Sequence, residues 1–188
     1  METTTKIVLI TVLCSIIIAL NAMFGLKDRF MNFLRSKLEI PTEREKLNQE
    51  RMKSDIDLYK KIKSYLDSDG NMMEIRDIHF GSSFRDNLTE DLHKFIWECK
   101  KPEFEFHNDE LESAKKELVN NLVSLLDSIG QYTFTNDTNT DFRSVPKDWS
   151  YKLPDKYEKV IKTLNSRADS TIDAYDLFIR KCRKELAL

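Results

Sequence analysis

Three histidines, at positions 79, 93 and 107, are the side chains best suited to acid–base or metal chemistry in this chain of 188 residues. Glu90 and His93 stand three residues apart, a spacing that puts both side chains on one helix face and occurs in di-iron helical bundles. Such a site needs two Glu-x-x-His pairs, and the sequence offers one. We therefore predict no metal site and no bound cofactor.

His107 is followed by acidic residues at positions 109 and 110 that could also serve as metal ligands. Acidic side chains in the first turn of a helix are, however, stabilised by the helix dipole without any metal. The sequence also lacks a glycine-rich phosphate loop, a His-Glu-x-x-His motif and a Gly-x-Ser-x-Gly motif. These observations favour a protein that is not an enzyme.

Residues 131–154 combine loop-forming Asn, Thr and Asp with five aromatic side chains. Aromatic rings bring apolar area that a disordered segment would leave in water. We therefore predict an ordered connection across the helices, with a lid over a ligand pocket as the alternative. The candidate interaction or pocket residues are Trp149, Tyr151, Phe142, His79 and His93.

The composition favours helices, because only four glycines and four prolines are present and 33% of the residues are charged. Thr42 and Glu45 have the spacing of a capping box at the start of a helix over 42–67. Further helices are predicted over 88–99 and 110–129. We expect an all-α fold in which these elements form an antiparallel helical bundle.

The longest predicted helix begins at Pro154 and carries a seam of side chains that are alternately four and three residues apart. The seam residues are Tyr157, Ile161, Leu164, Ala168, Thr171, Tyr175, Phe178 and Cys182. A sustained repeat of 3.5 residues is typical of coiled-coil packing. The seam could pack inside the domain or against a second copy of the chain, and the sequence leaves both open.

Residues 7–26 are 20 consecutive uncharged residues, enough for a helix to span a hydrocarbon core of roughly 30 Å. Their flanks lack the cleavage pattern of a secretion signal, so we predict a retained signal-anchor. The predicted organisation is an external tail over 1–6, a transmembrane helix over 7–26, a basic amphipathic segment over 27–41 and a cytosolic helical domain over 42–188.

Basic residues are unevenly distributed about this apolar segment. Lys6 precedes it, whereas five basic residues follow it between positions 27 and 44, and the more basic side normally stays in the cytoplasm. We therefore predict a single-pass protein of a bacterial inner membrane or a plasma membrane, with the N-terminus outside and the C-terminal domain cytoplasmic. The lipid bilayer is the partner predicted for residues 7–26.

The net charge of -2 argues against a nucleic-acid partner, which would require a broad basic face. Residues 67–112 contain thirteen acidic and five basic side chains, which fits a solvated acidic face or a docking surface for a basic partner. Three cysteines show neither metal-ligand nor disulfide spacing.

These observations together indicate a membrane-anchored protein–protein interaction module: an adaptor, sensor or effector subunit that binds a protein partner, or itself, through helical surfaces. The alternative is a membrane-tethered enzyme or nucleotide-sensing domain with a pocket under the 131–154 aromatic loop.

Overall fold

The chain is mostly helical in the computed structural model, which describes residues 42–66, 70–136 and 139–188 and the isolated positions Ser15, Ala19, Ala22, Met23 and Phe33. The helices in these residues are α2 (Glu43–Tyr65), α3 (Asn71–Asp77), α4 (Leu88–Glu98), α5 (Asp109–Tyr132), α6 (Trp149–Lys152) and α7 (Pro154–Glu185), with a 3-10 turn, η1 (Pro102–Phe104). The short strands are β1 (Phe84–Arg85), β2 (Phe134–Thr135) and β3 (Phe142–Ser144). The mostly helical fold predicted from composition is thus confirmed.

Helix α2 begins with the predicted capping box. The Thr42 backbone N–H donates to Glu45 Oε2 at 2.6 Å, and the Glu45 N–H donates to Thr42 Oγ1 at 3.2 Å. These hydrogen bonds satisfy donors that the first turn of a helix otherwise leaves free. They also lower the pKa of the Glu45 carboxyl.

The chain divides into two compact units, residues 1–49 and 50–188, and the sites below belong to the second.

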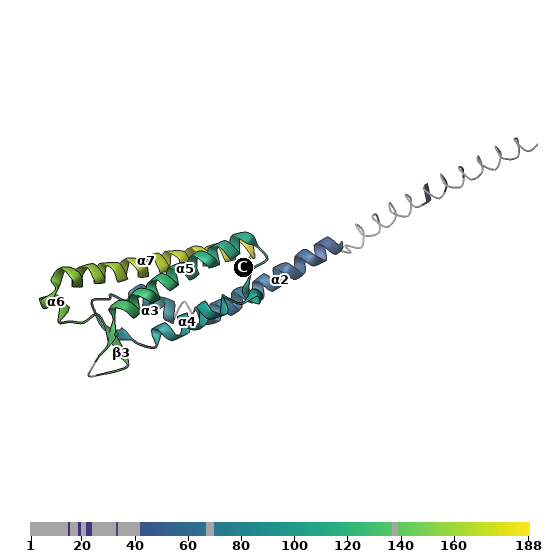
Figure 1. Ribbon diagram of the computed structural model, residues 1–188. Helices are drawn as coiled ribbons and strands as arrows, with labels where there is room; N and C mark the ends of the chain where they lie inside the picture. Colours follow the sequence, from purple (N-terminus) through teal and green to yellow (C-terminus); the bar gives the residue numbers. More distant parts are fainter. Residues whose placement is uncertain are drawn as a thin grey trace, which may run out of the picture. The chain divides into compact units, whose positions relative to one another are not determined.

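Helices α5 and α7 lie side by side and form the main pair of the unit made by residues 50–188 (Figure 1). They run antiparallel. Arg167, in the middle of α7, donates to the Ser124 carbonyl in the second half of α5 at 2.7 Å. Lys184, in the last turn of α7, interacts electrostatically with Glu110 at the start of α5. The core between them includes Leu111, Leu118, Leu122, Leu125 and Leu164.

The C-terminal seam is buried inside this unit. Its buried members are Leu164, Ala168, Thr171, Tyr175, Phe178 and Cys182, whereas Tyr157 and Ile161 are half-buried against the core. The Phe178 ring centroid lies 6.3 Å from that of Tyr59 in α2. The Tyr175 hydroxyl donates to the Leu66 carbonyl just beyond α2 at 3.3 Å. Of the two arrangements left open by the sequence, packing within the domain is the one observed.

An aromatic cluster attaches α4 and η1 to the end of α2. The Phe95 ring centroid lies 6.4 Å from that of Tyr65, and the Phe104 ring lies 6.3 Å from Tyr65 and 6.4 Å from Phe95. Tilted and edge-to-face rings at these distances attract one another in addition to burying apolar area. Because Phe95 faces the core, Trp97, two positions further along the helix, points away from it.

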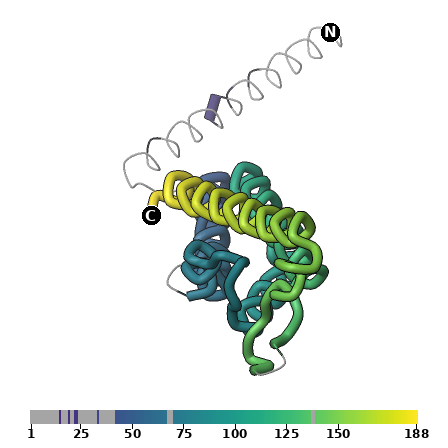
Figure 2. The backbone as a smooth tube through the Cα atoms, turned by 90° about the vertical axis from the view of Figure 1, so that its left-hand side faces the viewer, coloured from purple at the N-terminus to yellow at the C-terminus, as the bar shows by residue number. Residues whose placement is uncertain are grey.

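A small antiparallel sheet, with strand order β1-β3-β2, accompanies the helices of this all-α fold. Phe84 pairs with Arg143, and Phe134 pairs with Ser144. The strands are only two or three residues long, too short for an alternating pattern to be recognised. Figure 2 shows the green segment between α5 and α6 extending away from the helices. The connection over 131–154 therefore carries regular structure: β2, β3 and α6.

The membrane predictions need correction. Within the part of the chain that the structure describes, no helix is both long enough and apolar enough to cross a bilayer. The long helices α2, α5 and α7 carry charged residues along their exposed faces. The prediction of a single-pass, signal-anchored protein with a cytoplasmic C-terminal domain is therefore not supported. The segments on which it rested, 1–6, 7–26 and 27–41, lie outside the described residues except for the isolated positions named above.

Candidate functional site

Two of the five candidate residues meet in one open cleft. His93 of α4 and Phe142 of β3 line this cleft, which has a volume of about 730 Å³. Asp86, Glu90 and Asp141 also line it, so its surface is polar and mainly acidic. Among the described residues, no group of three or more His, Cys, Asp or Glu side chains is arranged to hold a metal ion.

His79 lies in a different cleft, of about 610 Å³, which it shares with Tyr157 of α7. Its Nδ1 atom accepts the Gly81 N–H at 3.2 Å. A Cβ atom at position 81 would stand 2.9 Å from the imidazole ring. A side chain at position 81 would therefore require the exposed His79 ring to move.

The two remaining candidates lie on the aromatic connection. Trp149 packs edge to face on Phe134 with ring centroids 6.4 Å apart, and the Lys156 ammonium lies 3.5 Å from the centroid of the tryptophan ring. Tyr151 is 77% exposed. The cleft formed by the connection itself, about 530 Å³, is lined by residues such as Phe134 and Ser144 and by none of the five candidates. The structure therefore does not bring the five residues together in one pocket.

Arg143 of β3 forms an ion pair with Asp86, the most buried acidic residue of the first cleft. Its guanidinium donates to Asp86 Oδ1 at 3.0 Å, to Thr133 Oγ1 at 3.1 Å and to the Thr133 carbonyl at 2.9 Å. These contacts tie the residue after β1 to the end of α5 through the central strand. The Asp86 carboxylate is thus neutralised within the fold, which leaves Glu90 and Asp141 as the exposed acids of the cleft.

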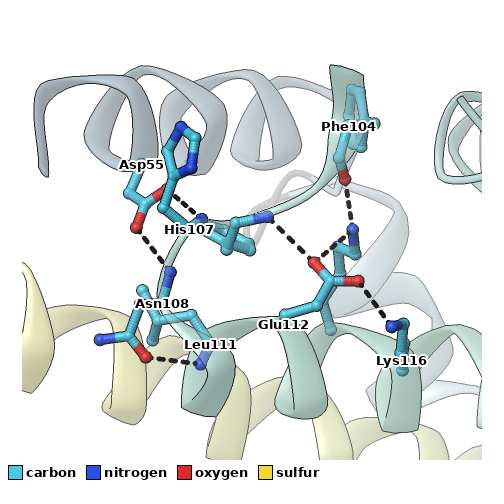
Figure 3. A network of polar contacts seen from close by, with 9 residues as sticks. Asp55, Phe104, His107, Asn108, Leu111, Glu112 and Lys116 are labelled. Carbon is cyan, nitrogen blue, oxygen red and sulfur yellow. Dashed lines mark hydrogen bonds and ion pairs between the residues drawn. The ribbon is translucent and has the colours of Figure 1, made fainter. Parts of the chain in front are cut away.

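Asp55 of α2 is a buried carboxylate, 4% exposed, that holds the start of α5. Its two oxygens accept the His107 N–H at 2.8 Å and the Asn108 N–H at 3.1 Å (Figure 3). The Asn108 side-chain oxygen accepts the N–H groups of Glu110 and Leu111 at 2.9 and 3.2 Å, as an N-cap does. A carboxylate on one helix thereby organises the first turn of another.

Glu112 and Lys115 form a buried ion pair in the next turn of α5. Lys115 Nζ lies 2.8 Å from Glu112 Oε2, with side chains 2% and 12% exposed. Lys115 also donates to the Phe104 carbonyl, and Glu112 Oε2 accepts the Phe106 N–H at 3.0 Å (Figure 3). Burial raises the pKa of Glu112, but the hydrogen bonds from Lys115 and Phe106 outweigh it, so the pKa is lowered overall. The pair holds the segment between η1 and α5.

Cys99 and Cys182 are free thiols that the fold makes unreactive. Burial raises the pKa of each to about 12. The charge of Lys115 partly opposes this effect at Cys99, whereas the charge of Asp55 adds to it at Cys182. Because the thiolate is the nucleophile, neither cysteine is suited to covalent catalysis.

We expect Cys182 to be alkylated by iodoacetamide at pH 8 about a thousandfold more slowly in the folded chain than in urea. A pKa about three units above the ordinary value of 9.0 reduces the thiolate population by that factor. Peptide mass spectrometry of timed aliquots would measure each cysteine separately. Equal rates in the folded and unfolded chain would contradict the buried position of the thiol.

The exposed face of α4 carries a large aromatic side chain beside an open groove. Trp97 is 66% exposed and lines an open groove of about 720 Å³ with Tyr65 and Ile96. Lys100 Nζ lies 5.7 Å from the centroid of the indole ring. Tryptophan is enriched at protein interfaces, where its large apolar area is removed from water. We call this groove and its rim the Trp97 surface.

The rim of the Trp97 surface is slightly basic. Glu98 is shared by Lys101 and by Lys61, the latter at 3.4 Å, and these cations lower the pKa of its carboxyl. Lys94 pairs with acids on its own helix. Lys100 has no ion-pair partner among the residues that the structure describes. A partner that brings an apolar side chain and a carboxylate would therefore be complementary.

The acidic stretch over 67–112 is less negative at the surface than its composition indicates. Among the residues of this stretch that the structure describes, five carboxylates lie in ion pairs with lysine or arginine side chains. They are Asp86, Glu90, Asp91, Glu98 and Glu112. A docking surface for a basic partner therefore has less support than the Trp97 surface.

Sequence reasoning missed Trp97 and Lys115, although both carried a signal. Leu92, Phe95 and Ile96 mark the buried face of α4, and Trp97 falls outside that face, which is unusual for tryptophan in a charged helix. Lys115 stands between Leu111 and Leu118 on the buried face of α5. In each case the residue type is unusual for its position on the helix, and such exceptions are expected at functional or strained sites.

Comparisons with protein-family models, with curated proteins and with solved structures found no match to this chain.

Proposed function

We propose that residues 50–188 form a helical protein-interaction module that binds a protein partner through the Trp97 surface. The observation that carries this proposal is the exposure of Trp97, 66%, in a groove lined by further apolar side chains. Interface energy concentrates in a few tryptophan, tyrosine and arginine side chains that fill pockets in the partner. An antiparallel arrangement of the helices suits this role, because it offers rigid faces on which such anchors are displayed.

The charges of the rim specify the partner more closely. Lys100 lies over the indole ring, and Lys61 and Lys101 together outnumber Glu98. We infer a protein segment with an apolar side chain beside an aspartate or glutamate. Its carboxylate would lie against Lys100 while its apolar side chain contacts Trp97.

The alternative, an enzyme or nucleotide-sensing domain using a pocket under residues 131–154, has weaker support. His93 and Phe142 line one cleft, His79 lines a second, and Tyr151 is exposed to solvent. Catalysis needs its groups within hydrogen-bond reach of one substrate. Binding of a protein partner at the Trp97 surface does not require several catalytic side chains to meet at one substrate.

A photo-crosslinking experiment tests the proposed function in cells that express the full chain. A benzophenone side chain at position 94, next to Trp97 on the exposed face of α4, is expected to give a discrete cross-linked product. The same probe at Val123 of α5, which is 37% exposed, serves as the matched control and should give none. Products of equal intensity at the two positions would contradict a specific surface.

Trp97→Ala is expected to abolish the product from position 94 and to weaken binding of the purified partner about thirtyfold or more, since a hot-spot side chain contributes at least about 2 kcal/mol. The free energy of unfolding should change by only about 0.5 kcal/mol, because the indole is largely exposed. Titration calorimetry and urea unfolding measure the two effects. Unchanged partner affinity in a folded Trp97→Ala variant would refute the proposal. A product of twice the chain mass would identify the partner as a second copy.

A further inference from the structure

A second surface, which shares no residue with the Trp97 surface, gathers four cationic side chains from three helices. Lys63 of α2, Arg76 of α3, and Arg180 and Arg183 of α7 line a cleft of about 310 Å³. Arg180 and Arg183 are three residues apart and therefore lie on the same face of α7. We call this the basic cleft.

The basic cleft has more positive charge than its own acids neutralise. Asp176 is its one acidic lining residue, and it pairs with Arg76 at 2.8 Å. Arg183 interacts with the hydroxyl of Tyr59. Within the described ranges, no acidic side chain forms an ion pair with Lys63, Arg180 or Arg183. Three positive charges therefore face the cleft without a matching carboxylate.

Like charges on one helix face, such as those of Arg180 and Arg183, repel one another, and an anion bound between them removes that repulsion. Guanidinium groups present parallel N–H donors that match the oxygens of a phosphate, and a lysine ammonium adds a point charge. The small volume of the cleft suits a single phosphate or diphosphate group better than the broad face of a macromolecule. Met72 and Ile179 supply an apolar wall beside the cations.

We infer that the basic cleft between α2, α3 and α7 binds a phosphate group, with Arg180, Arg183 and Lys63 as its ligands. Two sources share this chemistry: the monoester of a phosphorylated side chain and the diphosphate of a nucleotide or polyphosphate. Arg76 is held by Asp176 and positions the edge of the site. This inference is independent of the Trp97 surface, so either can fail without the other.

Titration calorimetry of the full chain with pyrophosphate and with O-phosphoserine, at constant ionic strength, tests the site. Binding of either ligand with a dissociation constant below about 1 mM, and a melting temperature that rises with its concentration, is the expected result. A tenfold preference for pyrophosphate points to the diphosphate source, and the reverse preference points to the monoester. Absence of binding by both at about 10 mM would overturn the inference.

Arg180→Gln is expected to weaken binding about tenfold, the value of one charge-assisted hydrogen bond. Lys184→Gln is the matched control: it removes one positive charge from the same helix, but Lys184 pairs with Glu185 and does not line the cleft. It should change affinity less than about twofold. Equal losses in the two variants would show diffuse attraction of anions to α7 and would overturn the site.

Discussion

Glu112→Leu is expected to lower the free energy of unfolding by about 3–5 kcal/mol, because it leaves the Lys115 ammonium buried without its counter-charge. Lys115 is only 2% exposed, so water cannot replace the lost carboxylate. The backbone N–H of Phe106 would also lose its acceptor. Urea unfolding followed by circular dichroism measures the change.

The double variant Glu112→Leu/Lys115→Met should be more stable than Glu112→Leu alone, since methionine removes the unpaired charge while filling a similar volume. A coupling energy of about 1–3 kcal/mol is expected between the two sites. Lys116→Met provides the control: Lys116 is 65% exposed and contacts the other oxygen of Glu112 at 3.4 Å, so its loss should cost less than about 0.5 kcal/mol. A Lys116→Met effect as large as that of Glu112→Leu would contradict the assignment.

The pH dependence of stability provides a second measure of the same pair. The pKa of Glu112 is lowered in the fold from its ordinary value of 4.5. A carboxyl with a lowered pKa contributes stability that is present above pH 4.5 and is lost as the pH falls through its folded pKa. The stability difference between the natural chain and Glu112→Leu should therefore shrink below that pH.

Local signals in the sequence identified much of this fold. The Thr42 and Glu45 capping box and the Pro154 helix start both depend on residues within one turn of each other, and both are present. The buried seam of α7 was readable for the same reason, because helical periodicity reports which face meets the core. That the seam contacts α2 and α5 could not be read from α7 alone.

The parts that were missed depend on partners distant in the chain. Strand β1 pairs with β3 through Phe84 and Arg143, and neither strand has a recognisable pattern of its own. Asp55 is buried because backbone N–H groups at positions 107 and 108 satisfy it. Lys115 is buried because the Phe104 carbonyl and Glu112 surround its ammonium. In each case, tertiary contacts determine the strand pairing or the burial of the side chain, which residue type alone does not predict.

The candidate site residues were chosen by residue type, and their part in function stays a prediction. Histidines and aromatics were selected for their chemistry, and the structure distributes them over separate clefts. Trp97 and Arg180, on which the two proposals depend, stand out by position instead: one is an apolar ring on an exposed face, and the other is a cation in a cleft with fewer acidic than basic side chains. The exposure of a side chain and the charges around a cleft are determined only when the helices pack together.

Leu164→Ala is expected to remove about 2–5 kcal/mol from the free energy of unfolding, a large part of the roughly 5–15 kcal/mol that stabilises a domain. Leu164 is 0% exposed in the middle of α7, so its truncation leaves a cavity in the core shared with α5. Leu153→Ala applies the same truncation to a leucine that is 47% exposed and should cost less than about 1 kcal/mol.

Urea unfolding of the two variants measures how much each truncation lowers the free energy of unfolding. The slope of this free energy against urea concentration should stay unchanged if only stability is affected. The midpoint should also be independent of protein concentration from about 5 to 100 μM, because the Leu164 side chain is buried within one chain rather than between two. A concentration-dependent midpoint would place the seam at an interface between copies. Equal costs for Leu164→Ala and Leu153→Ala would contradict the burial on which the packing of α7 against α5 depends.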